Sequence, residues 1–197
     1  MINFDYDSFH IRLIGNLIGY SFEKGSVHTE FGKIYFEKDE LTHEEYELSK
    51  TITFRQLYSD SLEFDTHYFK EVMQYKDKLW ETFETHGQIT TPIFKRRICK
   101  TDHPTMTKSK LFNYYIQAFE TEFMMGILSK IHKALVAHKS LVVLYVYDSI
   151  LIDYSISDGV GIIKTIIECM EENNMGVHVE MGKSYHEMLD VSARFNL

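Results

Sequence analysis

Residues 141–154, which read LVVLYVYDSILIDY, constrain the fold more than any other segment of this chain. Two runs of β-branched, leucine and aromatic side chains flank the polar pair Asp148-Ser149, and this pattern predicts a β-hairpin with a tight polar tip. Shorter strands are predicted at residues 2–6 and 177–181. A long stretch of helical patterning separates the first strand from the hairpin. This order favours an α+β fold with a helical insertion at that point.

Helical spacing of apolar residues accounts for most of the remaining chain. It predicts helices over residues 9–17, 27–38, 44–58, 68–85, 107–138 and 158–172, and a short helix near the end of the chain. Thr42 followed by Glu45 is a capping box, which marks the start of the third helix. In the second helix, Phe31, Ile34 and Tyr35 are expected on one side.

The composition is that of a folded domain without a membrane span. The 197 residues are 44% hydrophobic and 25% charged, and no window approaches the length of apolar sequence that a spanning helix needs. The first seven residues carry acids where a signal peptide carries bases. Cys99 and Cys169 are spaced for neither a metal site nor a disulfide framework, so reduced thiols in a reducing compartment are expected. The net charge of −8 disfavours coating of nucleic acid by global charge but allows a local basic channel.

Two acidic residues are candidates for metal-dependent chemistry. Asp5 stands at the C-terminal end of the first predicted strand, and Asp148 stands at the tip of the predicted hairpin. Alone, Asp148 is explained as an ordinary turn residue. If the two strands are neighbours, the two carboxylates can share two Mg²⁺ ions, which clamp the attacking and leaving oxygens of a phosphoryl transfer.

A second candidate is one face of the helix predicted over residues 44–58. Tyr46, Lys50, Phe54 and Tyr58 follow one another at steps of four and therefore share one side. The simpler interpretation is a partly buried aromatic stripe with a lysine that reaches solvent, and base rates for apolar helix faces favour it. The functional interpretation is a cation placed for a triphosphate, beside a ring that stacks on a base or sugar.

Two further groups are candidates for contacts with nucleic acid. Asn113 and Gln117, four apart in the predicted long helix, either hydrogen-bond to each other or reach acceptors in the minor groove. A basic cluster either forms a solvated loop or binds phosphates. Its members are Lys95, Arg96, Arg97, Lys100, Lys108 and Lys110.

In order along the chain, these segments resemble the motifs of family A DNA polymerases, the bacterial DNA polymerase I type. Residues 5–12, DYDSFHIR, resemble motif A, and residues 26–29, SVHT, resemble the segment that follows it. Residues 50–58, KTITFRQLY, resemble motif B with its spacing of Lys, Phe and Tyr. Residues 113–117, NYYIQ, resemble the family's Asn-x-x-x-Gln helix, and VYDS at 146–149 resembles motif C. The resemblance spans nearly the whole chain.

The resemblance implies template-directed DNA synthesis, in which a nucleotidyl group passes from a dNTP to a primer 3′-OH. Asp5, Asp148 and the backbone carbonyl of Tyr6 would hold two Mg²⁺ ions, and Lys50 would act on the triphosphate and protonate the leaving group. Contacts to the incoming nucleotide would fall on Tyr6, His10, Lys50, Phe54 and Tyr58. Contacts to primer-template DNA would fall on Arg96, Arg97, Lys108, Lys110, Asn113, Gln117 and Tyr147.

In the terms of that family, residues 1–18 are expected to form palm, residues 19–90 helical fingers, and residues 91–197 palm, with the antiparallel sheet and the motif C hairpin packed on helices. The family's thumb and exonuclease regions lie upstream of motif A. The resemblance therefore implies a C-terminal part or split subunit that works with a separate N-terminal polypeptide. It also implies the cytoplasm of a bacterium or a phage-infected host, with an organellar location left open, and no membrane partner.

Several positions depart from the family pattern and keep two alternatives open. His10 replaces the Glu that excludes ribose, and Tyr147 and Ser149 stand where motif C has His and Glu. Single-subunit RNA polymerases share the serine, whereas Phe54 favours the DNA enzyme. The alternatives are an RNA-synthesising relative and a catalytically silent subunit that binds DNA or a partner.

Overall fold

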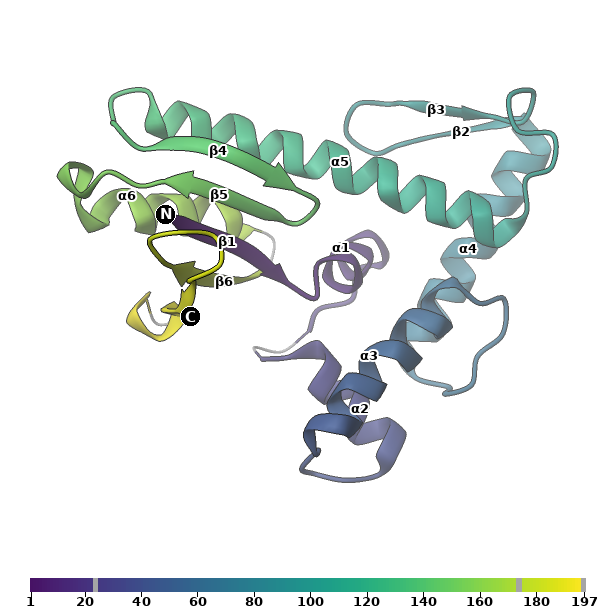
Figure 1. Cartoon of the computed structure of the whole chain (residues 1–197). Coiled ribbons are helices and arrows are strands. Elements are labelled where there is room, and N and C mark those ends of the chain that lie inside the picture. The colour runs from purple at the N-terminus through teal and green to yellow at the C-terminus, as the bar shows by residue number, and fades with distance from the viewer. Residues whose placement is uncertain (23–24, 173–174, 196–197) are drawn as a thin grey trace. The chain divides into compact units, whose positions relative to one another are not determined.

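The computed structural model of the chain describes residues 1–22, 25–172 and 175–195, and it divides into two compact units (Figure 1). Met1–Arg12 and Phe123–Leu197 form the first unit, and Leu13–Glu122 forms the second. Both divisions fall inside helices. The boundaries between palm and fingers expected from the sequence, after residues 18 and 90, stay a prediction.

An antiparallel sheet forms the centre of the first unit (Figure 1). Its strands, in order across the sheet, are β4 (Leu141–Val146), β5 (Ser149–Asp153), β1 (Ile2–Asp7), β6 (Gly176–Met181) and β7 (Leu189–Asp190). The helical segments of this unit are the second part of α5 (Lys108–Leu135), the turn η1 (Ile156–Asp158), α6 (Gly159–Met170) and the turn η3 (Ser192–Phe195). The predicted α+β class and its antiparallel hairpin are confirmed.

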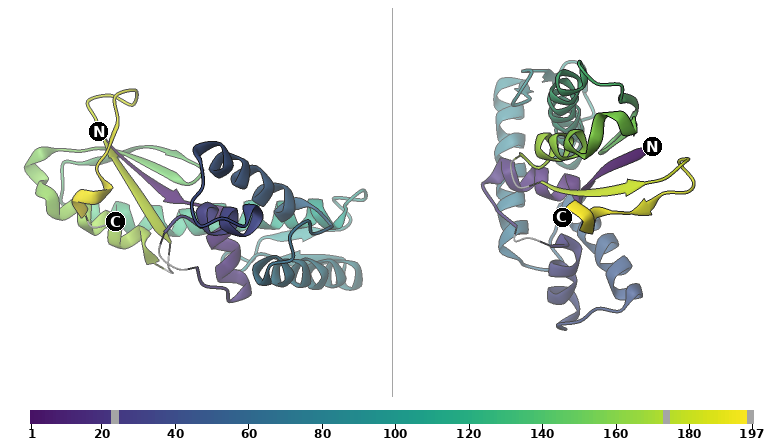
Figure 2. Two further views of the ribbon diagram at one scale, coloured as in Figure 1. Left: turned by 90° about the horizontal axis from the view of Figure 1, so that it is seen from below. Right: turned by 90° about the vertical axis from the view of Figure 1, so that its left-hand side faces the viewer.

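The alternation of side chains along β1 separates the core of this unit from its polar face. Ile2, Phe4 and Tyr6 point to one side and are buried. Helix α6 covers that side, where the Tyr6 hydroxyl donates a hydrogen bond to the Met170 carbonyl at 3.0 Å (Figure 2). Asp5 and its alternate neighbours point to the opposite side. One strand therefore anchors the sheet and also presents acidic side chains.

The second unit is mainly helical. Its elements are most of α1 (Phe9–Ile18), α2 (Val27–Phe36), α3 (His43–Tyr58), α4 (His67–His86), the hairpin strands β2 (Gln88–Thr90) and β3 (Arg97–Cys99), and the first part of α5. Its core is aromatic, since the ring centroids of Phe31, Tyr68 and Phe69 lie 5.1–5.5 Å apart in tilted or edge-on pairs. Among the described residues, no helix of either unit carries a long enough apolar run to cross a membrane.

Two helix ends follow local sequence signals. The Thr42 hydroxyl accepts from the Glu45 N–H at 3.2 Å, and the Glu45 carboxylate accepts from the Thr42 N–H at 2.9 Å. The predicted capping box is therefore confirmed as the start of α3. Gly87 ends α4 with φ of 70°, a left-handed conformation that glycine adopts without steric cost.

Three local features differ from the sequence prediction. The hairpin β2–β3 was not expected, because its strands are three residues long and carry too few positions for a period of two to show. The short terminal helix is replaced by β7 and the 3₁₀ turn over Ser192–Phe195. Ile34 is 48% exposed, because α2 buries Phe31 and Tyr35, which are four apart, and leaves Ile34 on the flank of that face.

Candidate functional site

The pairing of β1 with β5 brings the two candidate carboxylates together. Asp5 is the direct cross-strand partner of Ser149, the residue that follows Asp148. The Tyr6 N–H donates to the Asp148 carbonyl at 3.3 Å, which ties the end of β1 to the turn between β4 and β5. The adjacency that the sequence left open is thus present in the structure, within one unit.

The electrostatics of Asp5 reflect this proximity. Burial raises the pKa of the Asp5 carboxyl to about 6, and the negative charge of Asp148 is the next largest cause. His178 opposes the shift, whereas Glu180 and Asp7 add to it. Two carboxylates on paired strands repel each other. A bound cation relieves this repulsion, so cation binding is favourable between them.

Strand β6 supplies two neighbours that the sequence analysis missed. His178 is paired with Asp5 across β1–β6, and Glu180 is paired with Asn3 and accepts from its side-chain amide at 3.3 Å. The His178 Nδ1 lies 3.1 Å from the Ser192 hydroxyl, which fixes the ring. The signal was available in the sequence, since His178 and Glu180 are the alternate polar positions of a strand whose other residues are apolar.

Asp7 is engaged by the start of α1. Its carboxylate pairs with the Arg12 guanidinium at 3.2 Å and accepts from the Ser8 hydroxyl at 3.1 Å. Arg12 is itself buried and also donates to the Asp7 carbonyl at 3.2 Å. These contacts assign Asp7 to the strand–helix junction, whereas Asp5 and Asp148 are the two candidate carboxylates whose charges interact most strongly.

The side chain and the backbone of Tyr6 have different environments. The ring is buried and stacked on Phe9 at 4.9 Å between centroids, so it belongs to the core. The N–H and C=O of one strand residue point the same way, so the Tyr6 carbonyl faces the turn that carries Asp148. Any contact of Tyr6 with a metal or nucleotide is therefore made through this carbonyl. The described residues contain no group of three or more His, Cys, Asp and Glu side chains arranged to hold a metal ion.

Tyr147 occupies the turn beside Asp148. It has φ of 54°, an uncommon value for a tyrosine, and its side chain is 76% exposed. The tip of the hairpin is Tyr147-Asp148, one residue earlier than predicted. His10 lies on the first turn of α1 and is half-buried, with its ring 6.1 Å from that of Phe9.

In the second unit, the face of α3 with Tyr46, Lys50, Phe54 and Tyr58 is not the buried one. The residues that α3 buries are Ser49, Ile52, Thr53, Gln56 and Leu57. Lys50 lies over the Tyr46 ring at 4.4 Å and donates to the Glu47 carboxylate at 2.8 Å. The hydrogen bond to Glu47 is the main reason that the pKa of Lys50 is raised, so the ammonium keeps its charge at neutral pH.

The two aromatic residues of the same face are accessible to different degrees. Phe54 is exposed, with its ring 5.8 Å from that of His28. Tyr58 is half-buried against Phe112, and burial raises its pKa to about 12. The simpler interpretation of this face, a partly buried aromatic stripe, therefore fits Tyr58 better than it fits Lys50 and Phe54.

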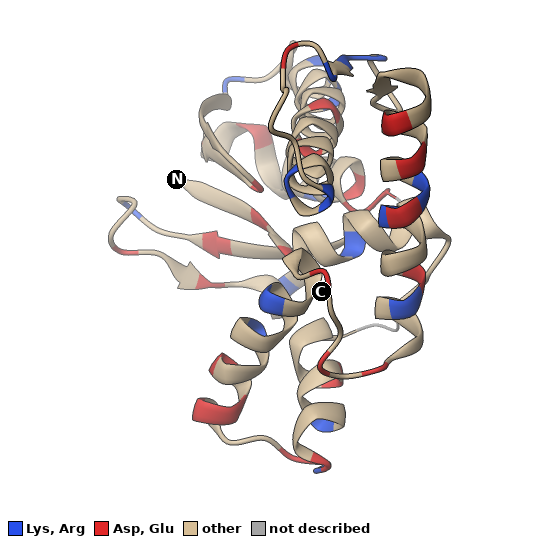
Figure 3. Ribbon diagram, turned by 90° about the vertical axis from the view of Figure 1, so that its right-hand side faces the viewer, with Lys and Arg blue, Asp and Glu red and all other residues tan. Residues whose placement is uncertain are grey.

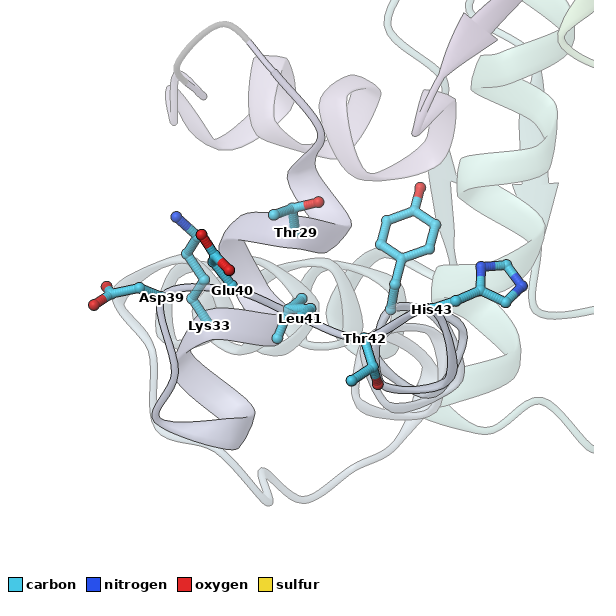
Figure 4. A pocket seen from close by; sticks show the side chains of 8 residues that line it. Thr29, Lys33, Asp39, Glu40, Leu41, Thr42 and His43 are labelled. Atoms are coloured by element: carbon cyan, nitrogen blue, oxygen red, sulfur yellow. The ribbon is translucent and has the colours of Figure 1, made fainter.

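A shallow depression of about 520 Å³ opens beside the start of α3 (Figure 4). Its lining residues are Thr29, Lys33, Asp39, Glu40, Leu41, Thr42, His43 and Tyr46. Asp39 and Glu40 make it unsuitable for a triphosphate, because their charges repel an anion. We assign no ligand to it.

The remaining predicted contacts lie on α5 and before it. The Gln117 side-chain amide donates to the Asn113 side-chain oxygen at 3.1 Å, which is the mutual hydrogen bond considered in the sequence analysis. Gln117 stays exposed, so a donor remains accessible. Lys108 is paired with Asp77 at 2.7 Å, and Lys110 is exposed. Arg96 and Arg97 are exposed at the hairpin β2–β3.

Comparisons with known proteins agree with this arrangement at the level of the fold. No protein-family profile matches the sequence, and no curated protein matches it. Among solved structures, the fold is similar to that of the POL domain of Pol1 from M. smegmatis, determined in complex with DNA primer-template and dNTP. The TM-score is 0.76 at 18% sequence identity, and the similarity covers 93% of this chain and 39% of that chain. The chain thus has the fold of a polymerase domain and spans less than half of the longer structure.

Proposed function

We propose that this chain carries out template-directed DNA synthesis, in which a nucleotidyl group passes from a dNTP to a primer 3′-OH. The observation that carries the proposal is the pairing of β1 with β5, which sets Asp5 beside Asp148. The likeness to a polymerase domain solved with primer-template and dNTP supports it. If Asp148 were only a turn residue, the fold would not need a second carboxylate on a neighbouring strand. A metal site that two carboxylates share does need one.

The donor atoms at this place fit a divalent cation. Asp5 and Asp148 supply anionic oxygens and the Tyr6 carbonyl supplies a neutral one, which suits Mg²⁺, an ion usually held by one or two carboxylates together with water and substrate phosphates. Two bound Mg²⁺ ions would lower the pKa of the primer hydroxyl and neutralise the departing pyrophosphate. Asp5 keeps most of its negative charge at neutral pH, although burial and the charge of Asp148 raise its pKa to about 6.

Within the second unit we assign the incoming nucleotide to α3. Lys50 supplies a persistent cation for the triphosphate and a proton for the leaving group, after its ammonium exchanges Glu47 for phosphate oxygens. Phe54 offers an exposed ring to the sugar and base, and Tyr58 lies by the template base. His10 is assigned to the sugar, where it takes the place of a carboxylate.

Primer-template DNA is assigned to polar and basic side chains of both units. Asn113 and Gln117 present amide groups to minor-groove acceptors, which all base pairs offer at similar positions. Arg96, Arg97, Lys108, Lys110 and Tyr147 are assigned to the DNA backbone. The similarity covers 39% of the solved polymerase chain. We keep as proposals, carried by the motif resemblance, that a separate N-terminal polypeptide adds contacts to DNA and that synthesis takes place in the cytoplasm.

Nucleotide binding and primer extension test this proposal. We expect the chain to bind a dNTP only when Mg²⁺ is present, measured by isothermal titration calorimetry. Asp148→Ala should weaken that binding at least about tenfold and reduce extension of a primer-template by about 10³-fold, which corresponds to about 4 kcal/mol less transition-state stabilisation. The matched control is Asp153→Asn, on the exposed end of β5, which should change neither quantity.

Each other outcome selects an alternative. Mg²⁺-dependent binding that is unchanged in Asp148→Ala contradicts the metal assignment. Extension that proceeds equally well with ribonucleotides supports an RNA-synthesising relative. Binding of primer-template without Mg²⁺-dependent dNTP binding supports a catalytically silent subunit.

A further inference from the structure

The loop between β2 and β3 is built around a buried carboxylate. Glu122 on α5 has no exposed surface. It accepts hydrogen bonds from the Ile93 N–H at 3.2 Å and the Phe94 N–H at 3.0 Å, and from the Thr91 hydroxyl. A carboxylate with three donors is satisfied without a cation. Its effect is to fix the backbone of the loop to the helix beneath it.

A second set of hydrogen bonds closes the loop across its base. The Thr91 N–H donates to the Arg96 carbonyl at 2.9 Å, and the Arg96 N–H donates to the Thr91 hydroxyl oxygen at 2.9 Å. Lys95 has φ of 56°, a left-handed conformation that a lysine rarely adopts, and its ammonium donates to the Pro92 carbonyl at 2.8 Å. The tip is therefore held in one conformation, at a cost in backbone strain.

This fixed tip presents apolar side chains to solvent. Ile93 is 46% exposed and Phe94 is 57% exposed, although both amides are bonded to a buried group. A flexible loop folds such side chains back against its own base, whereas this loop holds them outward. An exposed aromatic ring on a strained, well-anchored turn is a feature of binding surfaces rather than of solvated loops.

The charge next to these side chains indicates what binds. Lys95, Arg96 and Arg97 form an exposed run of cations, blue in Figure 3, and none of them pairs with a carboxylate among the described residues. The next cations along the chain are paired, Lys100 with Glu84 and Lys108 with Asp77, each at 2.7 Å. In a chain of net charge −8, three adjacent cations without counter-ions favour a polyanion over an acidic or apolar protein surface.

We propose that this tip, residues 92–97, binds a single-stranded stretch of nucleic acid, with the Phe94 ring stacked on an unpaired base and Lys95, Arg96 and Arg97 on the neighbouring phosphates. Base stacking on an aromatic ring between cations is the general means of binding single strands without sequence preference. A duplex offers no free base face, so the single strand is the form recognised. The inference deepens the proposed function and rests on it, because a template strand ahead of the primer supplies such a stretch.

Oligonucleotide binding by the full chain tests the inference. The probe is a fluorescently labelled oligo(dT), followed by anisotropy at two salt concentrations. We expect Phe94→Ala to weaken binding about 5- to 150-fold, the range for removal of one stacked base, and Phe94→Tyr to retain it. Tyr185→Ala, which removes an exposed aromatic ring of the first unit, is the matched control and should bind as the wild type does.

The cations have a separate signature. Replacing Arg96 and Arg97 by Ala should reduce the slope of log affinity against log salt concentration by about 0.7 for each phosphate that the variant no longer neutralises. Phe94→Ala should leave that slope unchanged, because stacking releases no counter-ions. Unchanged binding of oligo(dT) by Phe94→Ala overturns the inference, and so does equally tight binding of a blunt duplex with the same dependence on Phe94. The first of these results leaves a protein partner as the occupant of the tip.

Failure of this inference and failure of the proposed function are distinguishable. Asp148→Ala should bind oligo(dT) normally, because the turn between β4 and β5 takes no part in the tip. If Phe94→Ala loses oligo(dT) binding while Asp148→Ala keeps full extension activity, the tip is confirmed and the catalytic proposal is wrong. If Asp148→Ala loses extension while Phe94→Ala binds normally, the reverse holds.

Discussion

At Asp5, the requirements of stability and of metal binding oppose each other. Burial and the charge of Asp148 raise its pKa from 3.8 to about 6 in the folded protein. The folded state therefore holds the Asp5 proton more tightly than the unfolded chain does. The contribution of Asp5 to the free energy of unfolding is fully present below pH about 4, falls as the pH rises, and is lost above about 6.

We expect Asp5→Asn to stabilise the metal-free protein at neutral pH. The shift of about 2 pKa units sets an upper bound of about 3 kcal/mol, which solvent screening of the half-buried group reduces to about 1 kcal/mol. The gain should be absent near pH 4 and complete above pH about 6. Urea unfolding of both proteins at pH 4.5 and 7.5 measures it.

The control for this experiment is an aspartate of the same sheet without a buried partner. Asp153→Asn, at the exposed end of β5, removes the same charge and should change stability equally at the two pH values. If Asp5→Asn destabilises the protein to the same extent at both pH values, the ionised carboxylate of Asp5 does not destabilise the folded state.

Strand β4 is an edge strand with exposed apolar side chains and no charged residue. It lies at the edge of the sheet, its sequence LVVLYV has no charge and no proline, and Leu141 and Val143 are 60% and 47% exposed. Exposed edges are normally blunted by charges, because their free N–H and C=O groups pair with other chains. The irregular register between Val142 and Leu144 is the one protective device that the described strand shows.

A charge on this edge should make the protein more soluble. We expect Val143→Lys to weaken concentration-dependent self-association by about tenfold, or about 1.4 kcal/mol, measured by sedimentation velocity at low and high protein concentration. Val160→Lys is the matched control, because Val160 is exposed on α6 and lies outside the sheet. Equal effects of the two substitutions indicate a general effect of charge and not of the edge.

Elements with a local signal were predictable from the sequence, and those without one were not. Helix α3 starts at its capping box, and the hairpin β4–β5 follows its two β-branched runs, because both depend on residues a few positions apart. The hairpin β2–β3 depends instead on Glu122, which lies 28 or more residues away from its hydrogen-bond donors Ile93 and Phe94. No periodicity of a three-residue strand reports such an interaction.

At the scale of the whole molecule, the pattern of residues did not predict which strands are neighbours in the sheet. The sequence identifies Asp5 and Asp148 as candidates, but only the order of strands in the sheet makes them neighbours. The resemblance to family A polymerases implied in advance that these two carboxylates converge, whereas periodicity carries no information on which strands pair. The alternation along residues 176–181 marks His178 and Glu180 as the polar positions of a strand, but only the pairing with β1 places them beside Asp5 and Asn3.

The central position of β1 has a consequence for how a cell makes this protein. Its partners β5 and β6 end at Asp153 and Met181, so β1 leaves the ribosome long before either exists. At about 5–20 residues per second, translation needs roughly 10–35 s to reach Met181. Until Asp153 is translated, the apolar side of β1 has no strand of the sheet to join, while the helices of residues 13–122 are already translated. The nascent chain therefore offers its first strand to chaperones before its last strand is translated.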